Sequence, residues 1–257
     1  MEDNPSLTTQ YKEQLKSEYK GLWYRRYIEG QWVLAEGTIY DFFDTALHTI
    51  KLPPAPAIYY IVGVDYGTTN PTAYSLIGYN PNAFPNMWME KEYYWDSRKQ
   101  NRQKTDSEFA IDLKKFISGL NVKAIYIDPS AASFRAELRK QNVMNLFDAE
   151  NEVLDGIRFQ SLLISNGTYK ICQNCPNAIK EYSQYRWDEK SVKLGEDRPL
   201  KENDHCTDSQ RYALFTHFFN KTRNTTAPQA LEDRWQKASG RSNFGGPFDQ
   251  NQNFRRS

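Results

Sequence analysis

The sequence is organised around residues 61–70, IVGVDYGTTN, where an apolar run ends in the carboxylate of Asp65 and the chain then turns at Gly67. A short apolar run bounded by a glycine turn predicts a buried strand. A rigid strand that carries an acid to the edge of its sheet is a suitable support for a metal ligand. Taken alone, the pattern fits equally well an aspartate that caps the turn, so the role of Asp65 depends on which other acids join it.

The composition is typical of a globular protein with nearly equal numbers of basic and acidic residues. Its 257 residues are enough for one large domain or two small ones. The net charge of +1, from 33 basic and 32 acidic residues, neither indicates nor excludes nucleic acid, because affinity follows the local patch. No apolar run approaches the roughly 18 residues of a membrane helix, and the N-terminus lacks the pattern of a signal peptide. Three cysteines, Cys172, Cys175 and Cys206, indicate a reducing compartment and not a disulfide framework.

A proline-rich segment divides the sequence. Residues 52–56, LPPAP, contain three prolines, which neither a helix nor a central strand tolerates. They separate a lead-in segment, residues 1–52, from a main domain expected over residues 53–220. The polar and glycine-containing residues 221–257 are expected to form a flexible tail.

Apolar periodicity predicts an α/β domain. Three successive strands, the first ending at Asp65, predict an antiparallel meander. The capping-box pattern of Thr105 and Glu108 starts a helix that ends before Gly119. The next strand ends at Asp128 and is expected to lie parallel to the first, because a helical crossover precedes it. The expected elements are a helix over 6–27, extended pieces at 32–35 and 40–43, strands at 58–65, 73–79 and 87–95, a helix over 105–117, a strand at 123–128, a helix over 134–140, a strand or loop at 153–163, a helix over 168–185, a hairpin at 185–190 and a helix over 204–220.

Three carboxylates are candidates for one metal site. Asp65 and Asp128 follow neighbouring parallel strands and should face the same crevice, and Asp208 lies one turn into the last helix. Clustered carboxylates repel one another unless they hold a cation, and their hard oxygens suit Mg²⁺ or Mn²⁺. Asp204 is four residues from Asp208 on the same helix face and is the alternative third ligand, with His205 nearby. Asp208 is preferred because Asp204 occupies the better capping position.

With these residues in place, the sequence resembles the C-terminal nuclease domain of the large terminase subunits of tailed bacteriophages. The resemblance covers roughly residues 1–220 and rests on six segments. They are VGVDYG at 62–67, NPTA at 70–73, YIDPSAA at 126–132, NEVLDGI at 151–157, YRWD at 185–188 and NDHCTDSQRY at 203–212.

The resemblance implies a ribonuclease H-like fold, with a mixed central sheet of five or more strands flanked by helices. It also implies an endonuclease that cleaves concatemeric viral double-stranded DNA during genome packaging. The acids that match the family's ligands are Asp65, Asp128 and Asp208. The expected cofactors are two Mg²⁺ or Mn²⁺ ions, which hydrolyse a phosphodiester together by activating a water and stabilising the leaving oxygen.

The resemblance further implies a portal protein and a small terminase subunit as partners. The expected location is the host cytoplasm, transiently at the procapsid portal, with no membrane association. Large terminase subunits begin with a packaging ATPase, but no Gly-x-x-x-x-Gly-Lys-Ser/Thr phosphate loop occurs in this sequence. The chain is therefore expected to be a nuclease portion without its motor, and residues 24–32 resemble the segment that joins the two.

Other interpretations remain open at this point. Residues 64–70 also resemble the first phosphate-binding turn of the sugar-kinase and actin-like superfamily, although no second phosphate loop is visible. A non-catalytic DNA-binding module of a packaging motor is a third possibility. The pair Cys172 and Cys175 lacks the second pair typical of a zinc site and is expected to pack within a helix. A basic stretch around Trp187 contains the candidate DNA contacts Arg186, Lys190, Lys193 and Lys201, and a solvated face explains it equally well.

Overall fold

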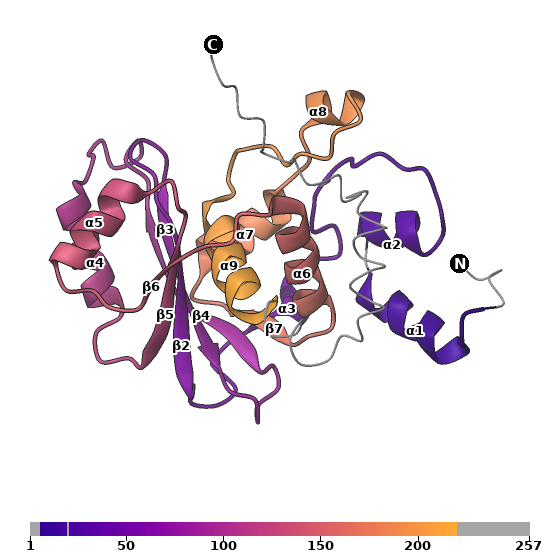
Figure 1. Ribbon diagram of the computed structural model, residues 1–257, viewed down its shortest axis with the longest axis horizontal. Coiled ribbons are helices and arrows are strands. Elements are labelled where there is room, and N and C mark those ends of the chain that lie inside the picture. The colour runs from indigo at the N-terminus through magenta and orange to yellow at the C-terminus, as the bar shows by residue number, and fades with distance from the viewer. Residues whose placement is uncertain (1–5, 20, 220–257) are drawn as a thin grey trace, which may run out of the picture. The chain divides into compact units, whose positions relative to one another are not determined.

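The computed structural model describes residues 6–19 and 21–219 (Figure 1). The flexible tail expected over 221–257 lies outside the described residues. No helix in the described part of the chain is long and apolar enough to cross a bilayer. The divisions expected near residues 52 and 220 remain predictions.

A seven-stranded mixed sheet forms the centre of the fold, in the strand order β1-β7-β4-β3-β2-β5-β6. The α/β class and the mixed sheet of five or more strands are therefore confirmed. The strands are β1 (Thr49–Ile50), β2 (Tyr59–Asp65), β3 (Thr72–Tyr79), β4 (Met87–Trp95), β5 (Val122–Ile127), β6 (Leu146–Asp148) and β7 (Tyr169–Cys172).

The register of β5 against β2 places two of the candidate acids at one edge of the sheet. Strands β2, β3 and β4 form the predicted antiparallel meander. Strand β5 pairs parallel to β2, as predicted, with Val64 opposite Ile127. Asp65 ends β2 and Asp128 directly follows β5, so both carboxylates leave the sheet at the same level.

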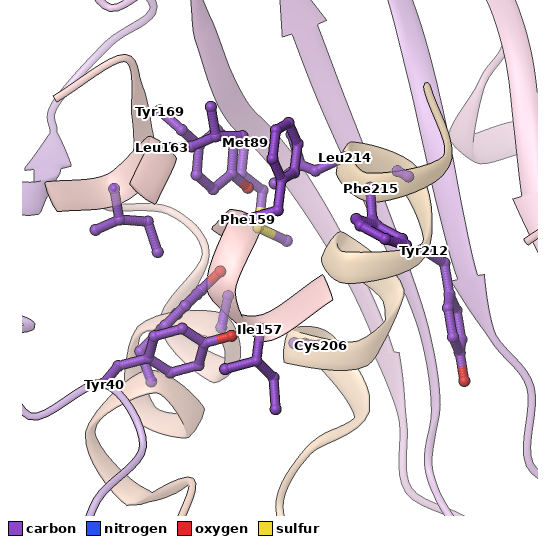
Figure 2. Close-up of a cluster of buried hydrophobic side chains, with 14 of the residues drawn as sticks. Tyr40, Met89, Ile157, Phe159, Leu163, Tyr169, Cys206, Tyr212, Leu214 and Phe215 are labelled. Carbon is purple, nitrogen blue, oxygen red and sulfur yellow. The ribbon is translucent and has the colours of Figure 1, made fainter. Parts of the chain in front are cut away.

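Helices cover both faces of the sheet (Figure 1). On one face, α4 and α5 bury Phe109, Leu113, Phe134 and Leu138 against the central strands. On the other face, α6, α7 and α9 enclose the larger core, in which the side chains of α6 and α9 meet (Figure 2). The helices are α1 (Thr9–Glu18), α2 (Gly21–Tyr27), α3 (Thr45–His48), α4 (Asp106–Phe116), α5 (Ala132–Lys140), α6 (Val153–Ser165), α7 (Pro176–Gln184), α8 (Glu189–Lys193) and α9 (His205–Leu214), and a π-helical turn, η1 (Phe215–Phe219), follows α9.

Helix α9 approaches strand β2 at backbone distance. A Cβ atom at Gly63 would lie 1.7 Å from the carbonyl oxygen of Ser209, so only glycine permits this contact. Beside it, the hydroxyls of Ser75 on β3 and Ser209 on α9 are joined by a hydrogen bond of 2.5 Å. The contact places the first turn of α9 next to the end of β2.

The lead-in segment differs from the expectation. The single helix predicted over 6–27 is wrong, because α1 ends at Glu18 and α2 begins at Gly21, whose φ of 54° is left-handed. The extended pieces predicted at 32–35 and 40–43 belong to no strand. A two-residue strand, β1, lies instead at the sheet edge and pairs parallel to β7.

The order of elements between residues 153 and 190 was also predicted wrongly. Residues 153–163 form helix α6 and not a strand or loop, and their apolar side chains contribute Ile157, Phe159 and Leu163 to the core (Figure 2). The helix predicted over 168–185 is strand β7 followed by α7, which begins at Pro176, a residue suited to the first helical position. In place of the hairpin predicted at 185–190, Arg186 forms an isolated bridge with Thr38 and Trp187 forms one with Pro199, and the short helix α8 lies between Trp187 and Pro199.

The contact between β2 and α9 predicts a large penalty for Gly63→Ala. The overlap with the carbonyl oxygen of Ser209 cannot be relieved unless the helix moves away from the sheet, so we expect a loss of more than about 3 kcal/mol in unfolding free energy. Urea denaturation followed by circular dichroism measures this loss. Gly119→Ala is the matched control, because its Cβ would meet nothing within 4 Å and only its left-handed φ of 76° costs about 1 kcal/mol. Equal losses in the two variants would contradict the assigned role of the contact.

Candidate metal centre

Asp65 ends strand β2 in a partly buried and acidic environment. Burial raises the pKa of Asp65 to about 6, the hydrogen bond to His205 acts in the opposite direction, and the carboxylates of Asp208 and Asp204 add to the increase. The Nδ1 atom of His205 lies 2.8 Å from Oδ2 of Asp65. Burial opposes the charged form of His205, but the hydrogen bond to Asp65 and the charge of Asp204 outweigh it and raise the pKa of the imidazole. The expectation that His205 lies near the acids is therefore met by its contact with Asp65.

Asp128, directly after β5, is held by hydrogen bonds. Its Oδ1 accepts from the backbone N–H of Ser130 at 2.8 Å. Its Oδ2 accepts from the hydroxyl of Tyr212 at 3.0 Å and from the amide of Asn151 at 3.1 Å. Partial burial works against the charge, but the bonds from Ser130 and Tyr212 and the charge of Arg211 outweigh it and lower the pKa of Asp128. The carboxylate is thus oriented and ionised at neutral pH.

Asp208 lies in the first turn of α9 and is buried between two cations. Nε of Arg211 donates to its Oδ1 at 3.2 Å, and Nη2 of the same arginine lies 3.1 Å from that oxygen. The ammonium group of Lys201 lies 3.0 Å from Oδ2. Arg211 is itself only 1% exposed, so this ion pair is shielded from water.

Asp204 precedes α9 at the N-cap position, but its side chain makes no capping hydrogen bond. Asp204 therefore occupies the capping position that was the reason to prefer Asp208, but its carboxylate is not used as a cap. Burial and the neighbouring Asp208 raise the pKa of Asp204. Its buried Oδ2 has no hydrogen-bond partner among the described residues, and the ammonium of Lys201 lies 3.5 Å away. Both acids therefore stay candidates for the third ligand.

Tyr212 lies within electrostatic reach of all three predicted acids. This side chain follows Asp208 by one helical turn, and its hydroxyl donates to Asp128. Burial raises the pKa of Tyr212, and the charges of Asp208, Asp65 and Asp128 all raise it further. The acids that affect the pKa of this phenol thus come from β2, from the end of β5 and from α9.

Several partners of the acids were not identified from the sequence. Arg211 follows Asp208 by three residues, a spacing that brings helical side chains together, so this pair was detectable. Glu181 on α7 was not, because its contact with the start of α9 joins residues that are 26 apart in the sequence. Its Oε2 accepts from the backbone N–H of Thr207 at 3.0 Å and its Oε1 has no partner among the described residues. Burial raises the pKa of Glu181 to about 7.

The chemistry of this donor set fits a hard divalent cation. Asp65, Asp204 and Asp208 offer oxygens that are close enough to perturb one another, and the buried Oδ2 of Asp204 lacks a hydrogen bond from the described part of the chain. Over residues 6–19 and 21–219, no three His, Cys, Asp or Glu side chains are already arranged to hold a metal ion. The imidazole of His205 contacts Asp65 and the ammonium of Lys201 contacts Asp208 instead.

The cysteines lie in different elements from those expected. Cys172 ends β7 and Cys175 occupies the N-cap position of α7, so the pair does not pack within one helix. Both thiols and that of Cys206 are free and buried. Burial raises the pKa of Cys172 to about 11, which keeps this thiol protonated.

The candidate DNA contacts occupy two different environments. Arg186, Lys190 and Lys193 are exposed on and before α8, whereas the ammonium of Lys201 faces the acids.

Near the ends of β2 and β5, a hollow of about 330 Å³ is lined by hydroxyl and amide groups of the turn after Asp65 and of the start of α5. Its lining includes Thr68, Thr69, Asn70, Ser130 and Ser133.

Comparison with known proteins relates this arrangement to one group. No family model matches the chain. The chain is 26% identical over 224 residues to the large terminase subunit of Escherichia phage T5, a match that covers 83% of this chain and 50% of that protein. It therefore spans about half the length of the curated relative that it matches.

Solved structures give the same result. The large terminase of a thermophilic bacteriophage is 44% identical with a TM-score of 0.78, over 85% of this chain and 55% of that one. The nuclease domain of the P22 large terminase is 15% identical with a TM-score of 0.56, over 70% of this chain and 92% of that domain, and this likeness shows the fold alone. The described residues therefore have the ribonuclease H-like fold of the nuclease domains of large terminase subunits.

Proposed function

We propose that the chain is a divalent-metal-dependent endonuclease that cleaves concatemeric double-stranded DNA during phage genome packaging. The observation that carries this proposal is the convergence of Asp65, Asp128 and Asp208 at one end of the sheet of a terminase nuclease fold. Neighbouring carboxylates repel one another unless cations neutralise them, and the carboxyl ends of parallel strands are a suitable place for metal-assisted hydrolysis.

The residues of the cluster have distinct tasks in this proposal. Asp65, Asp128 and Asp208 hold the ions, with Asp204 as the alternative to Asp208. When bound there, two Mg²⁺ or Mn²⁺ ions activate a water and neutralise the leaving oxygen of the phosphodiester. Tyr212 orients Asp128 through the hydrogen bond at its Oδ2, and Arg211 pairs with Oδ1 of the buried Asp208.

The DNA and the partner proteins follow from the same proposal. The exposed side chains of Arg186, Lys190 and Lys193 are suited to contact a DNA backbone without sequence preference. The packaging ATPase, the portal protein and the small terminase subunit are the proposed partners, in the host cytoplasm at the procapsid portal. The half of the T5 relative that lies outside the match leaves room for the ATPase.

Substitution of the strand-end acids tests the catalytic role. We expect Asp65→Asn and Asp128→Asn each to reduce cleavage of supercoiled plasmid with Mn²⁺ at least about a hundredfold, because a lost ligand removes several kcal/mol of charge stabilisation. Gel electrophoresis of the plasmid measures cleavage, and circular dichroism checks that each variant is folded.

Asp148→Asn is the matched control. Asp148 ends the neighbouring parallel strand β6, but its side chain is 58% exposed and pairs with Arg135 outside the cluster. This variant should cut at the wild-type rate. A wild-type chain that binds plasmid but leaves it intact at every Mn²⁺ concentration would favour the non-catalytic DNA-binding module instead.

The choice between the two acids of α9 is open to a direct measurement. In crystals soaked with Mn²⁺, we expect anomalous density within about 2.0–2.2 Å of Asp208, as for a hard divalent ion. Asp204 should make no direct bond to the metal, so Asp204→Asn should retain the same density peak. A peak that lies on Asp204 and disappears in Asp204→Asn would reverse the assignment.

A further inference from the structure

The two carboxylate oxygens of Asp208 have partners of very different mobility. Oδ1 belongs to Arg211, whose guanidinium is buried and also stacks over the ring of Tyr212 at 4.7 Å. A Cβ atom at Gly156 would lie 2.7 Å from Cγ and Cδ of Arg211, so helix α6 confines the arginine as well. The side chain of Arg211 therefore cannot move away from Asp208, and Oδ1 of Asp208 keeps Arg211 as its partner.

The second oxygen is held by a cation that can leave. Lys201 belongs to the segment before α9, and its side chain is 63% exposed although its ammonium lies 3.0 Å from Oδ2 of Asp208. The same ammonium lies 3.5 Å from Oδ2 of Asp204, which has no hydrogen bond from any described residue. A long and flexible side chain thus brings one positive charge from the solvent side to two buried acids.

We propose that Lys201 is a built-in counter-ion, which occupies a cation position at Oδ2 of Asp208, beside Asp204, and is displaced when a divalent ion binds. The inference rests on the proposed function of the acid cluster. An ammonium and a metal ion cannot both contact the same Oδ2, and their charges repel one another in a site of reduced dielectric. Arg211 leaves only Oδ2 free to change partners, so Asp208 is a ligand through this single oxygen.

The exchange gives Lys201 two effects of opposite sign. In the metal-free protein it relieves the repulsion among carboxylates that come from α9 and β2, and so it stabilises the fold. During metal binding it competes with the ion, and so it lowers the affinity. Once displaced, its exposed side chain is free to reach a DNA phosphate, which agrees with its position in the basic stretch.

Isothermal titration of Mn²⁺ into the metal-stripped chain without DNA tests the competition. Lys201→Met keeps the aliphatic stem and removes the charge, and we expect it to bind Mn²⁺ about two- to fivefold more tightly than the wild type, the range for the loss of an exposed ion pair. Lys115→Met is the matched control, because Lys115 is exposed on α4, against the other face of the sheet. It makes the same change in net charge and should leave the affinity unchanged.

Thermal unfolding provides a second measurement. The metal-free Lys201→Met variant should melt at a lower temperature than the wild type, and Mn²⁺ should raise its melting temperature by more. Unchanged or weaker Mn²⁺ binding by Lys201→Met, or equal tightening in Lys115→Met, would overturn the inference while leaving the proposed nuclease intact. A wild type and a Lys201→Met variant that both bind no Mn²⁺ would overturn the inference and the proposed function together.

Discussion

The backbone contact between Gly63 on β2 and Ser209 on α9 is the constraint on which the candidate site depends. It brings a helix to a strand without intervening side chains, and it does so one residue after Asp208 and two residues before Asp65. Asp65 and Asp208, which are more than 140 residues apart in the sequence, are therefore close enough to influence one another electrostatically. The hydrogen bond between Ser75 and Ser209 supports the same contact from β3.

This proximity creates a charge problem that the surrounding residues solve. Burial and mutual repulsion raise the pKa values of Asp65 and Asp204, so the ionised forms of these carboxylates are disfavoured. The buried guanidinium of Arg211 pairs with Asp208, and the imidazole of His205 forms a hydrogen bond with Asp65. The arrangement is that of a site suited to receive cations, because its permanent positive charges do not cover all of the carboxylate oxygens.

The sequence predicted best those elements whose signal is local. The meander β2 to β4, helix α4 with its capping box, and strand β5 all have clear periodicity or caps, and the structure confirms them. Prediction failed where burial on all sides hides the period. Helix α6 is apolar around much of its circumference, and β7 is only four residues long before Pro176 starts the next helix. Gly21 divided the N-terminal helix by adopting a left-handed φ, which sequence alone does not reveal.

The sequence by itself determined the α/β class, the strands that end at Asp65 and before Asp128, and the helix that carries Asp208, because strand and helix periods and caps depend on neighbouring residues. Only the tertiary structure decided the charge balance of the site. It showed that Asp204 caps nothing, that Arg211 and Lys201 take different oxygens of Asp208, and that Glu181 supports the start of α9. These relations join elements far apart in the chain, and the distances that decide them arise only when the sheet and α9 are packed together.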